Sequence, residues 1–408
     1  MDTEIYISLP PAFNDDPALQ PTAKNSTTTH RLLKGVPGIP QGSRLFNDKL
    51  NAVLVSLGFR RAPDDYCLYV HSTLPSLYIA LWTDDGYIIH NNQTAIAAIK
   101  NHLENTFDMK FLGGNSFDML GVAIERDRAN RTLSLSQSTT VTNLLDKAGM
   151  KDCKPAPTPV ATSFVFTKDD CPQTEFEVAD MMEDARWYRS ILASCIYIVK
   201  WTRADCSFAL SKLGKFMRNP GPKHVQALKR FLRYLKGTVD YKLVYNFSGG
   251  VPRAGIYAYF DSAHNDDVDT GRSTMAYLFF YEGCLLSWFS KLHPMVTTST
   301  NHSEYVASAK CAREAAWWDK IMTTMRLTEA VRPIATFSDS NGAICMNYNP
   351  VHHEANKHVA LADHYAREQV ELGYITVTYV STNDMLADAL TKALCESKFL
   401  KLIAQFMN

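Results

Sequence analysis

The sequence predicts an α/β fold, because strand-like and helix-like segments alternate through its last third. Apolar runs typical of buried strands cover residues 256–260, 334–338 and 374–380, and a helical pattern covers residues 304–325. A chain of 408 residues is long enough for two or three domains with cores of their own. We therefore expect a mixed sheet flanked by helices in the C-terminal part, with further domains before it.

The composition is that of an ordinary globular protein, with 46% hydrophobic and 21% charged residues. No apolar stretch is long enough to cross a membrane, and the N-terminus lacks the layout of a signal peptide, so we expect neither a membrane partner nor secretion. The nine cysteines include no Cys-x-x-Cys pair, which favours reduced thiols in the cytoplasm or nucleus. Because the formal net charge is zero, any surface that binds nucleic acid must be local.

In the N-terminal part, two acids are predicted at the tip of a β-hairpin. Residues 77–82 and 87–89 are strand-like, and Asp84 and Asp85 lie between them with Gly86 at the bend. Asp-Asp pairs occur elsewhere in the chain, so the pair alone is weak evidence. The hairpin setting is what indicates a pair of metal ligands.

A linker rich in proline, residues 154–159, leads into a segment with a basic helix. After residues 219–222, apolar side chains recur at helical spacing as far as Gly237, while Lys229, Arg233 and Lys236 share another face. Two interpretations stay open. The face is either an ordinary solvated surface or one that neutralises successive phosphates of a nucleic-acid backbone.

Four acids in the last third carry the strongest functional signal: Asp261, Glu304, Asp339 and Asp388. Asp261 ends the first apolar run, Glu304 opens the helical stretch, and Asp339 follows the run 334–338. Sites in α/β sheets gather where strand ends and helix starts converge. Four acids converging there would repel one another unless cations bind between them, and oxygen ligands suit Mg²⁺. Any one of these acids alone could equally be an ordinary capping or surface residue.

Six short sequence motifs occur in a fixed order around these acids, at residues 259–263, 271–274, 287–291, 303–307, 338–343 and 386–392. Together they resemble the ribonuclease H domain of copia-type LTR retrotransposon polyproteins. The resemblance implies a five-stranded mixed sheet flanked by helices that cuts the RNA strand of an RNA–DNA hybrid. It also implies that the four acids hold two Mg²⁺ ions, with Mn²⁺ as a substitute.

This chain departs from the family pattern at several positions but keeps all four acids. Ala263 stands where the family has a second acid, and His264 replaces a tryptophan. Before Glu304, Asn301 and His302 replace the family's usual Thr-Glu. Ala360 ends a Lys-His-Val-Ala motif at the position where the family has an acid. A decayed or co-opted fragment that binds nucleic acid without catalysis therefore stays open as the alternative. Integrase-like strand transfer fits poorly, because such sites use three acids.

Residues 1–160 resemble part of a reverse transcriptase. The Trp-Thr-Asp-Asp sequence that ends at Asp85 is similar to the polymerase Tyr-x-Asp-Asp box, so the resemblance implies that Asp84 and Asp85 are its metal ligands. Residues 37–44 resemble the loop before the palm helix, which implies nucleotide or template contacts for Gln41, Gly42 and Arg44.

Residues 4–13 resemble the segment that follows the first catalytic aspartate of the palm. We therefore expect the fingers and that aspartate to precede Met1, in an upstream Pol segment, and we expect no polymerase activity from this chain alone.

The predicted organisation is thus a partial palm and thumb over residues 1–160, a connection segment with the basic helix over 161–250, and a ribonuclease H-like domain over 251–408. The predicted partners are an RNA–DNA hybrid and an RNA template. The predicted location is a cytoplasmic particle or the nucleus.

Overall fold

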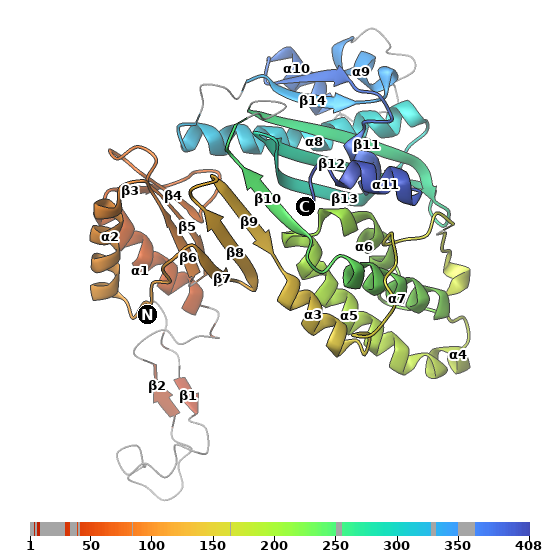
Figure 1. Ribbon diagram of the computed structural model, residues 1–408, viewed down its shortest axis with the longest axis horizontal. Coiled ribbons are helices and arrows are strands. Elements are labelled where there is room, and N and C mark those ends of the chain that lie inside the picture. The colour runs from red at the N-terminus through yellow and green to blue at the C-terminus, as the bar shows by residue number, and fades with distance from the viewer. Residues whose placement is uncertain are drawn as a thin grey trace, which may run out of the picture. The chain divides into compact units, whose positions relative to one another are not determined.

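The computed structural model describes residues 4, 6–8, 29–32, 39, 41–83, 85–163, 165–249, 255–327, 332–349 and 364–408. Its contacts divide the chain into two units, Met1–Phe111 with Thr323–Arg326, and Leu112–Met322 with Leu327–Asn408 (Figure 1). The predicted boundaries at residues 160 and 250 stay a prediction. Within the described residues, no helix combines the length and the apolar character needed to cross a membrane.

The first unit contains a four-stranded antiparallel sheet in the order β3-β4-β5-β6. Its strands are β3 (Phe59–Arg61), β4 (Leu68–His71), β5 (Tyr78–Trp82) and β6 (Asp85–Ile89). Helices α1 (Gly42–Ser56) and α2 (Gln93–Thr106) pack on it through a shared apolar core that includes Leu54 and Leu103. A short pair of strands, β1 (Tyr6–Ser8) and β2 (Thr29–Arg31), is also present. The predicted hairpin is confirmed, because β5 and β6 pair from Tyr78 with Ile89 to Trp82 with Asp85. The predicted place of Gly86 at the bend was wrong, because Gly86 lies within β6 opposite Leu81.

The second unit begins with an antiparallel sheet in the order β10-β9-β8-β7 and a group of helices. The strands are β7 (Ser116–Met119), β8 (Val122–Asp127), β9 (Thr132–Ser136) and β10 (Lys242–Asn246). The helices are α3 (Ser138–Lys147), α4 (Glu175–Asp180), α5 (Met182–Trp201), α6 (Ser207–Gly214) and α7 (Pro222–Gly237), with short 3₁₀ turns η2 (Lys168–Asp170) and η3 (Ala204–Cys206). Since β10 pairs with β9, residues on both sides of position 160 share one sheet.

A buried ion pair stabilises this helical group. The Arg203 guanidinium donates to both Asp205 oxygens, at 3.0 and 2.8 Å, and Tyr234 donates its hydroxyl to the same carboxylate at 2.6 Å. Arg203 also donates to the Thr238 carbonyl at 3.0 Å. Arg203 and Asp205 are both about fully buried, so each charge relies on the other for compensation.

The predicted basic helix is α7, and its first turn is fixed by a buried histidine. Gly221 donates its backbone N–H to His224 Nδ1 at 2.8 Å, and the imidazole stacks on Phe216 with ring centroids 3.9 Å apart. A Cβ at position 221 would lie 1.9 Å from the Asp170 carbonyl oxygen, so this close approach requires glycine. Desolvation lowers the pKa of His224 from 6.5 to about 4.

We expect His224 to make the fold sensitive to mild acid. A histidine with a lowered folded-state pKa contributes stability that is present above about pH 6.5 and is lost as the pH falls toward about 4. The thermal midpoint of wild type should therefore fall over this range more steeply than that of His224→Asn, which keeps an acceptor for Gly221 but does not titrate. Parallel curves for the two proteins between pH 7 and pH 4.5 would contradict this role.

The C-terminal part of the second unit is a five-stranded mixed sheet in the order β13-β12-β11-β14-β15. Strands β11 (Ile256–Asp267), β12 (Arg272–Tyr281) and β13 (Cys284–Val296) are antiparallel, whereas β14 (Ile334–Ser338) and β15 (Ile375–Tyr379) run parallel to β11. The remaining elements are α8 (Thr300–Thr324), α9 (Asn341–Tyr348), α10 (Tyr365–Glu371), the 3₁₀ helix η6 (Leu386–Leu390) and α11 (Glu396–Ile403). The predicted α/β architecture is present.

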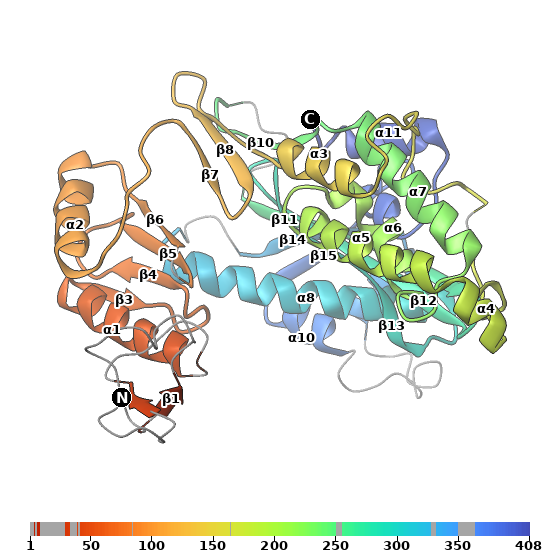
Figure 2. The same cartoon turned by 90° about the horizontal axis from the view of Figure 1, so that it is seen from below.

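The sheet is buried on both faces, which explains its long apolar runs. On β12, Phe279 joins the core formed with α8, and Phe280 joins the core formed with α11 and the helices α5 to α7 (Figure 2). Alternate side chains of one strand therefore serve two layers of helices.

Two predicted element boundaries were wrong. Asp261 does not end its strand but lies in the middle of β11, because pairing with β12 continues through Asp261 with Ala276 and Ser262 with Met275. Glu304 does not open its helix, because α8 begins at Thr300, so Glu304 lies just over one turn inside.

Candidate active site

Three of the four predicted acids meet at the centre of the mixed sheet. Strands β11 and β14 pair in parallel with Tyr259 opposite Phe337, and Asp261 and Asp339 each follow two residues later. Glu304 reaches the same point from α8. One oxygen from each of these carboxylates lies within 4.8 Å of the others. Asp261 and Glu304 are buried, and Asp339 is half-buried.

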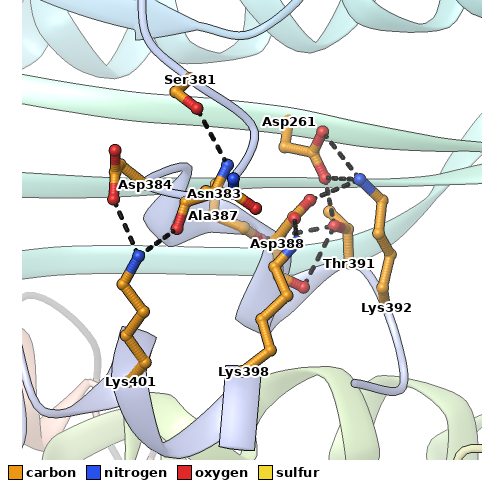
Figure 3. Close-up of polar contacts among 10 residues, drawn as sticks. All are labelled: Asp261, Ser381, Asn383, Asp384, Ala387, Asp388, Thr391, Lys392, Lys398 and Lys401. Carbon is orange, nitrogen blue, oxygen red and sulfur yellow. Dashed lines mark hydrogen bonds and ion pairs between the residues drawn. The ribbon is translucent and has the colours of Figure 1, made fainter. Parts of the chain in front are cut away.

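The fourth acid, Asp388, lies in η6 and is linked to Asp261 through the residues that follow it (Figure 3). Lys392 Nζ contacts Asp388 Oδ1 and also lies 3.2 Å from Asp261 Oδ2. Thr391 donates its hydroxyl to Asp261, and Lys398 Nζ lies 2.5 Å from Asp388 Oδ2. The four acids therefore form one connected polar group, with lysines on the Asp388 side.

Burial and mutual repulsion disfavour the charged forms of Asp261 and Glu304. Desolvation raises the pKa of Asp261, which the Asp388 and Asp339 carboxylates raise further and Lys392 lowers. Desolvation, followed by the charges of Asp261 and Asp339, raises the pKa of Glu304 well above its usual range. Burial lowers the pKa of Lys392, but Asp261 and Asp388 outweigh it, so that the pKa is raised overall. The pKa shifts of Asp261, Glu304 and Lys392 thus all favour added positive charge beside these residues.

The acids fit a hard divalent cation. Glu304 Oε2 is buried, and no group in the described part of the chain forms a hydrogen bond with it. An unsatisfied buried carboxylate oxygen is costly, and oxygen donors of this kind are the ligands that Mg²⁺ and Mn²⁺ prefer. In the same described residues, this is the one place where three acids, histidines or cysteines come together closely enough for an ion.

The residues predicted for polymerase chemistry belong to the first unit, and those that the structure describes are not part of such a group. Asp85 is exposed at the start of β6, and Asp84 lies outside the described residues. Gln41 is the N-cap residue of α1, Gly42 begins that helix, and the exposed Arg44 lies 3.9 Å from Asp48. Their nucleotide or template role stays a prediction.

The basic side chains of α7 are partly engaged by neighbouring segments. Lys229 lies over the Trp187 ring, 5.9 Å from its centroid, and Arg233 donates to the carbonyls of Lys154 and Pro155 at 2.6 and 3.3 Å. Lys236 is half-buried. Lys229 and Arg233 thus contribute to packing, and a role of the three in binding phosphates stays a prediction.

The sequence reasoning missed the lysines that contact the acids. Lys392 lies four residues after Asp388, a spacing that brings opposite charges together on one helical face. The four-residue spacing, within the motif at residues 386–392, was a signal that could have identified Lys392. Lys398 belongs to α11, and only the tertiary structure brings it to Asp388.

Comparison with known proteins finds relatives among transposon proteins. Residues 1–162 match the family described as reverse transcriptase (RNA-dependent DNA polymerase). The chain is 31% identical over 401 residues to the retrovirus-related Pol polyprotein from transposon TNT 1-94 of Nicotiana tabacum. This alignment covers 98% of this chain and 29% of that protein. It is 32% identical over 406 residues to the corresponding polyprotein from transposon RE1 of Arabidopsis thaliana, covering 97% and 26%. The chain thus spans less than a third of the length of these curated relatives.

A shorter relative is matched over nearly its whole length. The putative transposon Ty5-1 protein of Saccharomyces cerevisiae is 26% identical over 316 residues, which cover 77% of this chain and 96% of that protein. Among solved structures, ribonuclease H1 from Halobacterium salinarum NRC-1 aligns with 34% of this chain and 95% of its own at 15% identity and a TM-score of 0.25. A TM-score of this size supports no conclusion about the site.

Proposed function

Because the chain is related to the Pol polyproteins of copia-type retrotransposons, and its first 162 residues match the reverse transcriptase family, we propose that its C-terminal part is a ribonuclease H. In this proposal, residues 251–408 cut the RNA strand of an RNA–DNA hybrid. The observation that carries it is the convergence of Asp261, Glu304 and Asp339 within 4.8 Å at the centre of a five-stranded mixed sheet. The resemblance of the six sequence motifs to ribonuclease H implies this arrangement of acids.

We propose that two Mg²⁺ ions, or Mn²⁺ in their place, are held by Asp261, Glu304, Asp339 and Asp388. Such ions lower the pKa of an attacking water and stabilise the leaving oxygen of a phosphodiester. The role of the protein is to hold the ligands still. Asp261 lies in β11, and Asp339 directly follows β14. Both are two residues beyond the paired residues Tyr259 and Phe337, so the two parallel strands bring the carboxylates to the same point.

Glu304 completes the group from α8, and its free Oε2 offers an unused ligand atom. In the absence of metal, Thr391 and Lys392 hold the Asp261 carboxylate by hydrogen bonding to it. We infer that hybrid recognition depends on minor-groove shape and 2′-hydroxyl contacts, so sequence preference should be slight.

The proposal is tested with the purified chain and three end-labelled substrates: an RNA–DNA hybrid, a DNA duplex and single-stranded RNA. The hybrid alone should be cut, and in its RNA strand, because only the hybrid combines a scissile RNA with the required groove shape. A folded chain that binds the hybrid but cuts none of the three would favour the alternative, a non-catalytic nucleic-acid-binding fragment.

We further propose that this chain, assayed by itself, does not extend a primer. Asp85 is exposed and belongs to no group of three acids among the described residues, whereas two-metal polymerisation needs such a group. Primer extension on an RNA template with Mg²⁺ or Mn²⁺ checks this. Robust template-dependent synthesis would show that the polymerase site is complete. As part of a Pol protein, the chain would work in a cytoplasmic particle or the nucleus.

A further inference from the structure

Lys392 lies between two of the acids that the proposed function assigns to the metal ions. Its Nζ lies 3.2 Å from Asp261 Oδ2 and 3.4 Å from Asp261 Oδ1, and it contacts Asp388 Oδ1 (Figure 3). Together with Thr391, Lys392 engages both oxygens of Asp261. A cation that bridges Asp261 and Asp388 therefore needs oxygens that Lys392 already contacts.

The side chain of Lys392 is placed so that it can leave. It is 37% exposed, whereas the Asp261 and Asp388 side chains are each 1% exposed. The lysine thus reaches the buried carboxylates from the solvent side. Its movement toward solvent would uncover both carboxylates without disturbing the strand or η6.

Lys398 provides a natural comparison, because its ammonium group pairs with Asp388 and not with Asp261. It approaches the other oxygen of Asp388, Oδ2, at 2.5 Å and is 29% exposed. Lys398 can stay in place when a cation uses Asp388 Oδ1 and Asp261. Both lysines therefore place a positive charge beside Asp388, but Lys398 contacts Oδ2, whereas Lys392 contacts Oδ1 and also Asp261.

We propose that Lys392 is a positioning residue that acts as an internal counter-ion and competes with the divalent cation for Asp261 and Asp388. In the metal-free protein it holds the two carboxylates together and offsets their repulsion. When a divalent cation binds between them, the ammonium group is repelled and moves toward solvent. Lys392 thereby sets the cation concentration at which the site fills. The inference rests on the proposed function, which places the cation between these acids.

The competition predicts opposite changes in stability and in cation affinity, which a merely structural lysine would not produce. In Lys392→Gln, the metal-free chain should unfold at a lower temperature, because Asp261 and Asp388 lose their counter-ion. The same variant should bind Mg²⁺ about tenfold more tightly, equivalent to about 1.4 kcal/mol, because the competitor is gone. A residue that only supports the fold would weaken both properties when replaced.

The experiment is isothermal titration calorimetry of Mg²⁺, repeated with Mn²⁺, into the full chain, with thermal unfolding of each protein in EDTA and in Mg²⁺. Lys392→Arg, which keeps the charge, should bind as wild type does. Lys398→Gln should also lower the metal-free midpoint, but its Kd for Mg²⁺ should change less than about threefold, about 0.65 kcal/mol. Saturating Mg²⁺ should raise the midpoint of Lys392→Gln more than that of wild type at the same concentration, because tighter binding stabilises the folded state more.

The outcomes separate the two proposals. If wild type binds Mg²⁺ and Lys392→Gln binds it equally or more weakly, the competition is wrong while the metal site stands. If Lys392→Gln and Lys398→Gln tighten binding equally, general charge is responsible and the specific role of Lys392 is also wrong. If neither Mg²⁺ nor Mn²⁺ binds to wild type or to any variant, the metal site itself is overturned, and the role of Lys392 with it.

Discussion

Asp339→Asn is expected to lower the rate of hybrid cleavage by at least about a thousandfold, which corresponds to about 4 kcal/mol of transition-state stabilisation. Asparagine has nearly the size of aspartate but removes one negative charge from the group that Asp339 forms with Asp261 and Glu304. Asp339 is half-buried at the end of β14, so the substitution should leave folding and hybrid binding almost unchanged. Single-turnover cleavage of an end-labelled hybrid measures the loss.

The matched control is Asp384→Asn. Asp384 belongs to the same C-terminal segment as Asp388, but its side chain is 63% exposed and forms an ion pair with Lys401 of α11 at 3.0 Å (Figure 3). The control should cut the hybrid at the wild-type rate. Equal losses in the two variants would mean that cleavage responds to surface charge and not to the acid cluster.

Asp205→Ala is expected to destabilise the chain by about 3–5 kcal/mol, the usual cost of leaving a buried charge without its partner. The substitution would strand the Arg203 guanidinium and would also remove the acceptor of the Tyr234 hydroxyl. Urea unfolding at neutral pH, followed by circular dichroism, measures the change in the free energy of unfolding.

The double variant Arg203→Met with Asp205→Ala separates this effect from a general loss of packing. If the buried charge is responsible, the double variant should be more stable than Asp205→Ala alone, because no unpaired guanidinium remains. If the double variant lost as much free energy of unfolding as the two single variants together, the two residues would act independently, which would contradict a coupled pair.

Much of the mixed sheet could be predicted from sequence because its strands are buried on both faces. The run 334–338 is β14, and β15 lies one residue inside each end of the run 374–380. Such strands read as continuous apolar segments. The same rule failed for β11, whose second half from Asp261 to Asp267 is mostly polar. Its pairing with β12 nevertheless continues to Ala263 and, after an irregularity, includes Asp267. Backbone pairing, which the side-chain pattern does not report, carries that strand past its apolar part.

The site could be predicted only in part, for a physical reason. Matching positions along two parallel strands brought Asp261, within β11, close to Asp339, just after β14, and sequence motifs indicated Glu304 and Asp388. The charges that balance them came from elsewhere, since Lys398 reaches Asp388 only because α11 packs beside η6. Distances between elements far apart in the chain depend on packing, and a single sequence carries no direct measure of them.

The central claim is that the acid cluster holds the divalent cations of a hybrid-cutting enzyme, and one measurement tests it most directly. The purified full chain is incubated with an RNA–DNA hybrid labelled at the RNA end, first in EDTA and then after Mg²⁺ is added in excess. We expect no cleavage in EDTA and cleavage of the RNA strand once Mg²⁺ is present. Cleavage that continues in EDTA, or a folded chain that leaves the hybrid intact in Mg²⁺ and in Mn²⁺, would contradict the claim.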